Sequence, residues 1–486
     1  MIERQNRINE LKECIKDHVN DLSAWLNSCE LRDSIEFGCG IFATRDIQPN
    51  ELLFSDKPLL LGPTGNKHEP IVCVICFEKI ENDVSCFLCP GQCGLVLCGN
   101  TACANQHEIE CQLLQKWKPQ NPNEVSFNKL KAMLVIRSLF LDKKQRNIFN
   151  LMQKNYISEQ NDIYFDDEFE HFPDDKETVA ALRDASAAIN TNTFKVLYRC
   201  DGSDDVSVRG FYSIMSLVNH KCSPNARHDI DKHFVGRIFA ARPIKKDEQI
   251  FISYSQLLWG TNSRRMHMMV SKQFLCSCNR CLDPTENSTN LSAIRCLNKD
   301  CDGLVLPIDA INFKSHAKCN LCEKMCENQR FLQIQEMSAL ITKNFVNKDF
   351  TLSELDHFIE FRLCKLVPKS NQFVVESKLK AIRMFSGTTF EDQNKIQCFC
   401  EDILRIIDKL DVGECSLKGI LAHRLYVIRQ KLKEFPPSEF DLNGDDRKRM
   451  SISKIDDFLN DDEQLLKTAK IILSNTSTAP ADIFDT

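Results

Sequence analysis

The sequence predicts an α+β, multidomain protein, and three observations lead to this prediction. Residues 37–61 and 206–256 alternate as strands do and carry turn signals, so we expect one β domain interrupted by inserts. A cysteine-rich segment and helical stretches lie between these two parts. From residue 328 onward the apolar residues recur at the spacing of packed helices. A chain of 486 residues has room for two to four such domains.

Charge and hydropathy exclude several classes of protein. The chain has 62 basic and 68 acidic residues and a net charge of −6, which is not typical of a nucleic-acid coat or a membrane-surface protein. No window holds the ~18 consecutive apolar residues that a membrane span requires. We expect no membrane contact and no direct nucleic-acid binding. We also expect a monomer of the cytoplasm, the nucleus or both.

The N-terminal 30 residues lack the apolar core of a signal peptide and predict a charged amphipathic helix. Its expected apolar face comprises Ile8, Leu11, Ile15, Val19, Leu22 and Leu26.

The 25 cysteines are the strongest signal in the composition. In a reducing compartment, clustered cysteines are more often metal ligands than disulfide partners. Three groups stand out, and the remaining cysteines are scattered as buried small hydrophobic residues often are.

The first group lies in residues 71–111 and predicts two interleaved zinc sites, because a structural zinc takes about four ligands. The ligands we expect are Cys73, Cys76, Cys89, Cys93, Cys98, Cys103, His107 and Cys111. With Cys86 the segment offers nine candidates, so one is surplus. The middle pair is either Cys86-x2-Cys89 or Cys89-x3-Cys93, and we take Cys86 as the spare.

The second group, "CSCNRC", supplies Cys276, Cys278 and Cys281, and three thiols leave one tetrahedral position to be filled from elsewhere.

The third group pairs Cys296-x4-Cys301 with Cys319-x2-Cys322 around a strand-like "DGLVLP", which predicts a zinc ribbon over residues 285–327. Cys326 competes as a ligand there, and ordinary surface or core thiols are the alternative.

The stretch "LVNHKCSPN" (Leu217–Asn225) places Cys222 two residues after His220. From these residues alone, Cys222 is a nucleophile with its base, half of a metal site or a plain buried thiol.

In their order along the chain, these motifs resemble those of the SET and MYND domain-containing lysine methyltransferases, most nearly the arthropod branch. "GCGIFATRDI" is similar to the family's opening strand, Cys73–Cys111 to its MYND finger, and "FLCSCNRC" to its post-SET cluster. "NTNTF", "LVNHKCSPN" and "FISY" are similar to its cofactor and catalytic segments. The C-terminal stretches "LVPKSNQFVVESKLKAIRMFSG" and "ILRIIDKLDVGECSLKGIL" resemble its helical tail.

The resemblance implies a split β-rich SET domain with an inserted finger. The expected units are an N-terminal helix (1–30), the first SET part (31–70), the MYND zinc finger (71–111), a helical SET insert (112–190), the SET core (191–260), the post-SET zinc segment (261–284), the zinc ribbon (285–327) and a C-terminal helical, TPR-like domain (328–486).

The resemblance also implies S-adenosyl-L-methionine as the methyl donor and three or four zinc ions, with Cys222 completing the site of Cys276, Cys278 and Cys281. Tyr254 is the implied catalytic residue, whose hydroxyl would orient the acceptor amine; the alternative is a core aromatic on a strand. The implied cofactor-binding residues are Gly38, Cys39, Gly40, Asn192, Asn219, His220, Tyr254 and Phe274.

One departure concerns Lys272 and Gln273, which stand where related methyltransferases often carry a second aromatic residue of the lysine channel. Two functions are therefore expected as alternatives. The first is a protein-lysine N-methyltransferase that acts on histone or non-histone proteins, in transcriptional regulation. The second is a weak or silent scaffold that binds partner proteins, including proline-containing peptides, through its finger and helices.

Overall fold

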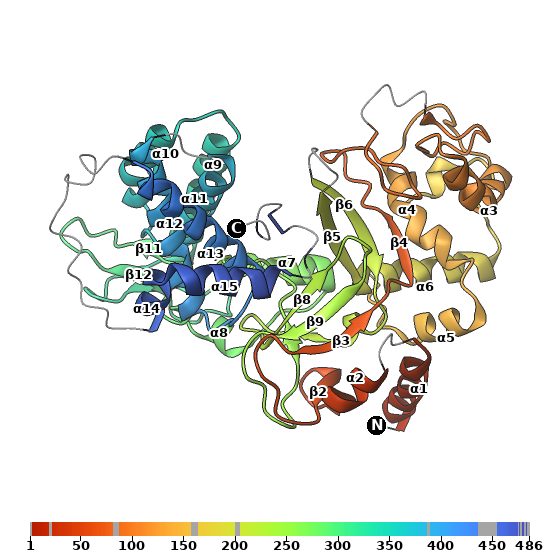
Figure 1. Cartoon of the computed structure of the whole chain (residues 1–486), viewed down its shortest axis with the longest axis horizontal. Helices are drawn as coiled ribbons and strands as arrows, with labels where there is room; N and C mark the ends of the chain where they lie inside the picture. The colour runs from red at the N-terminus through yellow and green to blue at the C-terminus, as the bar shows by residue number, and fades with distance from the viewer. Residues whose placement is uncertain are drawn as a thin grey trace.

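The structure is a computed structural model of the whole chain. It describes residues 2–18, 22–80, 87–156, 164–199, 205–385, 389–435, 454–474, 476, 479, 480 and 483. In Figure 1 the strands β3–β6, β8 and β9 and the helices α3–α6 form one side of the molecule, and the helices α9–α15 form the other. The predicted mixture of helices and strands and the helical C-terminal part are confirmed.

The N-terminal half contains most of the predicted inserts. Its elements are α1 (Ile2–His18), α2 (Leu22–Ser28), β1 (Cys29–Ser34), β2 (Gly38–Ala43), β3 (Leu52–Asp56), β4 (Leu60–Pro63), α3 (Thr101–Trp117), α4 (Phe127–Ser138), α5 (Lys143–Leu151), η2 (Asp166–Glu168) and α6 (Lys176–Asn192). The predicted single N-terminal helix is present as α1 and α2. On α2 it is Trp25 that is buried, while Leu26 is 59% exposed.

The second β stretch and the segment after it follow α6. Their elements are β5 (Thr193–Arg199), β6 (Asp205–Phe211), η3 (Met215–Leu217), β7 (Asn219–His220), β8 (Ala226–Ile230), β9 (Gly236–Ala240), β10 (Phe251–Ile252), α7 (Thr261–Lys272) and α8 (Asn279–Leu282).

The two β stretches pair with each other, as the sequence predicts. β3 pairs with β9 in the sheet β3-β9-β8, and β4 pairs with β6 in the sheet β4-β6-β5. β7 and β10 form a short parallel pair, in which Asn219 lies opposite Phe251. Segments on either side of the inserts therefore form one unit. The pairing of β7 with β10 brings Asn219 close to the segment that carries Tyr254.

A buried carboxylate fixes the turn that precedes β7. Asp56, at the end of β3, accepts hydrogen bonds from the backbone amides of Ile214 (2.8 Å) and Met215 (2.9 Å). Its side chain is 1% exposed. The approach of η3 to β7 is thus set by a residue more than 150 positions earlier in the chain.

The C-terminal half begins with a small sheet and continues as helices. Its elements are β11 (Ile294–Arg295), β12 (Leu304–Pro307), β13 (Ala317–Cys319), β14 (Met325–Cys326), α9 (Asn328–Val346), α10 (Leu352–Phe361), η4 (Leu363–Lys365), α11 (Gln372–Met384), α12 (Phe390–Lys409), α13 (Ser416–Lys433), α14 (Lys454–Asn460) and α15 (Asp462–Leu473).

The start of α13 is attached to the β sheet. The Ser416 hydroxyl donates to Asp229 Oδ1 over 2.9 Å, and the Glu414 amide donates to the Ala241 carbonyl over 2.7 Å. These contacts fix one edge of the helical part beside β8 and β9. In the described part of the chain, no helix combines the length and apolar character that membrane crossing requires.

Candidate functional site

A cavity of about 480 Å³ lies among α1, the start of β2, η3 and the end of α7. It is lined by Arg7, Ile8, Phe37, Gly38, Cys39, Met152, Gln153, Asn155, Asn192, Ser216, Leu217, Asn219, Lys272, Gln273 and Phe274. Among them are five of the residues expected to bind the cofactor: Gly38, Cys39, Asn192, Asn219 and Phe274. We call this space the inner cavity.

Asn219 is held against the β1–β2 hairpin. Its Nδ2 donates to the carbonyls of Cys39 (3.0 Å) and Phe37 (3.3 Å). An amide nitrogen has two hydrogens, so both are used within the protein and Oδ1 remains as the acceptor for a ligand. The geometry therefore favours the acceptor role for Asn219 toward a ligand.

Gly40 does not line the inner cavity but packs directly beside Asn219. A Cβ at this position would lie 2.2 Å from Gln249 Nε2 and 2.8 Å from Asn219 Nδ2. No side chain fits at position 40 without displacing the side-chain amide of Asn219, which donates to the Cys39 carbonyl. Glycine at position 40 is thus required by close packing, and Gly38 adopts a positive φ of 75° at the tip of the same hairpin.

His220 joins the catalytic candidate to a cysteine cluster. The Tyr254 amide donates to His220 Nδ1 over 2.9 Å, so Nε2 carries the ring hydrogen and faces Cys222 Sγ at 3.3 Å. The imidazole centroid lies 5.3 Å from the Tyr254 ring and 5.9 Å from the Phe274 ring. His220 is not among the described residues that line the inner cavity; it supports two that face the site.

Tyr254 follows β10 and lines a second, larger cavity. Its hydroxyl donates to the Val218 carbonyl over 2.6 Å. Burial raises the pKa of the Tyr254 phenol above its ordinary value. The hydroxyl therefore stays protonated across the physiological range and acts as a hydrogen-bond donor.

The larger cavity, which we call the outer cleft, has a volume of about 740 Å³. It is lined by residues of the β sheets and α7, and by Val412, Cys415, Ser416 and Leu417 of the helical part. The inner cavity and the outer cleft share three lining residues, which are Asn192, Ser216 and Lys272. These three residues mark the place where the two spaces adjoin.

Asn192 ends α6 at this junction. Its Nδ2 donates to the carbonyls of Gln153 and Ala188, both over 2.7 Å. The side chain is 4% exposed. Because both amide hydrogens bond to the protein, its contact with a ligand is through Oδ1 or the backbone.

The outer cleft carries several charged groups. Despite burial, hydrogen bonds from Lys195, Ser207 and Thr64 lower the pKa of Glu69 to about 2. Arg227 pairs with Asp229 at 3.1 Å.

Four groups of cysteine and histidine could each hold a metal ion, because their ligand atoms lie within 4.8 Å of one another. They are Cys73, Cys76, Cys98 and Cys103; Cys89, Cys93, His107 and Cys111; Cys222, Cys276, Cys278 and Cys281; and Cys296, Cys301, Cys319 and Cys322. All sixteen predicted ligands therefore fall into sets of four. Cys86 lies outside the described residues.

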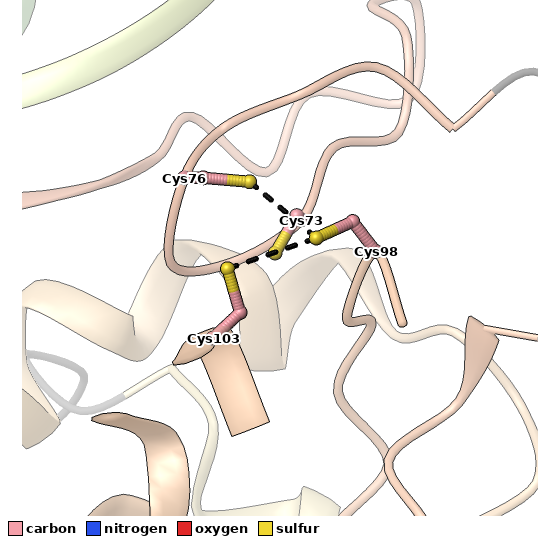
Figure 2. A group of neighbouring side chains, drawn as sticks. All are labelled: Cys73, Cys76, Cys98 and Cys103. Atoms are coloured by element: carbon pink, nitrogen blue, oxygen red, sulfur yellow. Dashed lines mark hydrogen bonds between the residues drawn. The ribbon is translucent and has the colours of Figure 1, made fainter. Parts of the chain in front are cut away.

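The two clusters of the 71–111 segment interleave along the chain. Figure 2 shows the first, in which the four sulfur atoms converge; Cys76 and Cys98 Sγ are 3.6 Å apart. In the second, His107 Nε2 lies 3.2 Å from Cys93 Sγ, and Nδ1 contacts Glu110 at 3.0 Å. A carboxylate on the far nitrogen is the usual orienting partner of a metal-binding histidine. The donor set therefore fits zinc.

Cys222 completes the third cluster across more than fifty residues, lying 3.9 Å from Cys276 and 3.5 Å from Cys281. Hydrogen bonds from Cys276 and then from Cys278 and Cys281 lower the pKa of the Cys222 thiol, which favours the thiolate that a metal binds. Arg264 Nη2 lies 3.6 Å from Cys281 Sγ and partly offsets the negative charge of four thiolates.

The fourth cluster lies in the sheet β11-β12-β13-β14. The amides of Asn298, Gly303 and Leu321 each lie 3.4 Å from the sulfur two residues earlier, namely Cys296, Cys301 and Cys319. Such amide–sulfur bonds stabilise thiolates. Cys326 is buried but is not part of this cluster.

Some lining residues carry no sequence signal. Arg7 and Ile8 come from α1, and Gln153 and Asn155 follow α5. Arg7 lies in the N-terminal helix, for which the sequence predicts only an apolar packing face, and no motif surrounds Asn155. Only the tertiary arrangement brings these segments to the inner cavity.

Comparisons with known proteins agree with these observations. The SET domain family matches residues 38–255. The SET domain-containing protein SmydA-8, isoform B, of Drosophila melanogaster is 33% identical over 426 residues, covering 85% of this chain and 94% of the fly protein. The human N-lysine methyltransferase SMYD2 is 25% identical over 273 residues, covering 50% of this chain and 58% of that protein.

Among solved structures, Rubisco LSMT bound to sinefungin and monomethyllysine matches with a TM-score of 0.33 and 11% identity, covering 88% of this chain and 92% of that one. This score is too low for that likeness to bear on the site.

Proposed function

The chain belongs to the SET and MYND domain-containing protein family, and from this premise we propose that it is an S-adenosyl-L-methionine-dependent protein-lysine N-methyltransferase. Its targets are histone or non-histone proteins, it acts in transcriptional regulation, and it is present in the cytoplasm, the nucleus or both. The observation that carries this proposal is the pair of adjoining cavities, with five of the expected cofactor residues in one and Tyr254 in the other.

The inner cavity suits S-adenosylmethionine in size and in donor set. About 480 Å³ is within the usual range of small-molecule sites. Phe274, which is 36% exposed, offers a ring on which the adenine can stack. Asn219 Oδ1 can accept from the ammonium group, and Arg7 is a cation for the carboxylate. The hairpin of Gly38 and Cys39 gives the ligand access to the backbone.

When bound, the cofactor supplies a methyl group on a positively charged sulfur. The chain's own residues must align the acceptor amine and keep it deprotonated. A lysine amine has an ordinary pKa of about 10.4, and a dry cleft lowers it by penalising the charged form. Tyr254, protonated and held by Val218 and His220, positions the amine at the junction of the cavities.

We assign zinc to all four clusters and a structural role to each ion, because closed sets of four ligands leave no open position for chemistry. Residues 73–111 are then the family's MYND finger with two ions, and proline-containing peptides are its proposed partners. The cluster of Cys222 is the post-SET site, which ties the Phe274 segment to β7. The protein is proposed to act as a monomer.

A specific observation favours the second candidate, a weak or silent scaffold. Lys272 and Gln273, which stand where related methyltransferases often carry an aromatic residue of the lysine channel, line the inner cavity. A labelled-methyl assay on cell-extract proteins, with wild type and Tyr254→Phe, separates the two functions. We expect labelled lysine with wild type and a loss of at least ~100-fold in the variant. Cofactor binding without any labelled protein would favour the scaffold.

A further inference from the structure

Lys272 lies between the two cavities and contributes the only cation that lines both, as far as the structure describes the chain. It is the last residue of α7, and the next residue, Gln273, adopts a left-handed conformation that ends the helix. The Lys272 ammonium donates to the Thr191 carbonyl over 2.6 Å and lies 3.5 Å from that of Thr193. These two carbonyls flank Asn192, the other polar residue that ends a helix at this junction.

The site of Lys272 is also the expected position of an acceptor amine. Its Nζ lies 5.7 Å from the centre of the Tyr254 ring. Backbone carbonyls and a tyrosine ring are groups that favour an amine or ammonium in a buried passage. The backbone of Lys272 is fixed as well, since Asn155 Nδ2 donates a hydrogen bond to the Lys272 carbonyl over 2.9 Å.

The charge of Lys272 is not neutralised by a carboxylate among the described residues. The neighbouring Arg209 donates to Asn190 and Thr193 oxygen atoms and is itself a partly buried cation. Burial, and then the charge of Arg209, lower the pKa of Lys272 to about 8. Even so, the amine carries its proton at neutral pH, so the junction of the two cavities has a positive potential.

We propose that Lys272 is an internal amine that occupies the passage between the inner cavity and the outer cleft, and that its charge makes the inner cavity favour S-adenosylhomocysteine over S-adenosylmethionine. This inference rests on the proposed function. The two compounds differ by one methyl group and one positive charge. Their relative affinity therefore reports the potential at the sulfur, and a cation in the same cavity lowers the affinity of the sulfonium form. An acceptor lysine enters this passage only when Lys272 moves aside.

Titration calorimetry of both compounds with wild type, Lys272→Met and Lys272→Arg tests the proposal. Methionine keeps the length and apolar stem of lysine without the charge, and arginine keeps the charge. We expect the preference of wild type for S-adenosylhomocysteine to fall at least ~10-fold in Lys272→Met and to persist in Lys272→Arg. The same preference in wild type and Lys272→Met would overturn the proposal.

A second measurement compares wild type with Lys272→Met at pH 7 and at pH 9.5. The titratable groups that face Lys272 are Arg209 on β6, His267 on α7 and Tyr254 after β10. Arg209 stays charged at both values. Burial and then Lys272 lower the pKa of His267, and burial raises that of Tyr254, so both rings are neutral at both values.

Among these groups only Lys272 loses its charge between pH 7 and 9.5. The positive sulfur of S-adenosylmethionine lowers the pKa of its own amino group, so the two compounds titrate differently over this range. This ligand effect is the same in wild type and Lys272→Met, and it cancels when the two proteins are compared at the same pH. We expect the difference in preference between wild type and Lys272→Met to shrink at pH 9.5, and an unchanged difference would overturn the proposal. If neither compound binds to wild type, Lys272→Met or Lys272→Arg, the result would instead refute the proposed function, and with it the inference.

Discussion

The backbone amide of Tyr254 donates a hydrogen bond to Nδ1 of His220 over 2.9 Å, while Nε2 of the same ring lies 3.3 Å from Cys222 Sγ. One imidazole thus connects the proposed catalytic tyrosine to a cluster that could bind zinc. Phe274, two residues before Cys276, packs near the same ring. Metal binding at this cluster should therefore influence the inner cavity without taking part in the chemistry.

The first prediction concerns this connection. Cys222→Ser should lower the zinc content by one ion per chain, because a set of three ligands holds zinc less well than a set of four. It should also weaken S-adenosylmethionine binding at least ~10-fold, because His220 and the Phe274 segment lose their attachment to the cluster; disturbed contacts around a metal site typically cost about 10–100-fold in metal affinity or activity. Elemental analysis and calorimetry measure the two effects. Cys400→Ser is the matched control, since Cys400 is equally buried in α12 and belongs to none of the four clusters. Unaltered zinc content in Cys222→Ser would show that the assignment is wrong.

The fourth cluster gives a prediction that separates two neighbouring thiols. Cys322→Ser should remove one zinc, because its sulfur lies 3.5 Å from that of Cys296 within the set of four. Cys326→Ser should retain all the zinc, although this thiol is four residues away and buried. Elemental analysis of both variants tests the choice of ligand. Loss of zinc from Cys326→Ser with retention in Cys322→Ser would reverse it.

Asp56 provides a prediction of pH dependence. Burial raises the pKa of its carboxyl to about 7, against the opposing effect of the Met215 and Ile214 amides. Since this is above the ordinary value of about 3.9, the folded protein binds more protons than the unfolded chain between about pH 4 and 7. The stability that the neutral acid contributes is present below pH 4 and is lost as the pH rises through 7.

Asp56→Asn carries no titrating group and therefore lacks this loss. From pH 6 to pH 8 the free energy of unfolding of wild type should fall by about 1.4 kcal/mol relative to the variant. Urea unfolding followed by tryptophan fluorescence measures it, because Trp25 packs on Phe54 of the same strand, with ring centroids 5.1 Å apart. Parallel pH profiles of the two proteins would contradict the prediction.

Local sequence signals were sufficient for some parts of the molecule. Cysteine spacing predicted most of the metal ligands because pairs such as Cys319 and Cys322 are only a few residues apart. Cys222, more than fifty residues from its partners, was assigned only through the family resemblance. Strand alternation predicted that two separate stretches form one β unit, and β3 does pair with β9. The C-terminal helices followed from apolar periodicity, and apolar residues of α12 such as Ile396 and Ile403 are buried.

Other features depend on tertiary contacts that no short pattern encodes. Arg7 reaches the inner cavity only because α1 packs against that region. The sequence showed that Lys272 departs from the expected aromatic, but the direction of its side chain depends on the carbonyls of Thr191 and Thr193. The hydrogen bond between Ser416 and Asp229 joins residues 187 positions apart.

The most direct test of the central claim is calorimetric titration of the purified protein with S-adenosylmethionine. It needs no knowledge of the substrate. We predict saturable binding to wild type, binding at least ~10-fold weaker to Asn219→Ala because the acceptor and the support of Cys39 are lost, and unchanged binding to Asn347→Ala, an exposed position at the end of α9. The absence of binding to wild type at high micromolar cofactor would contradict the account.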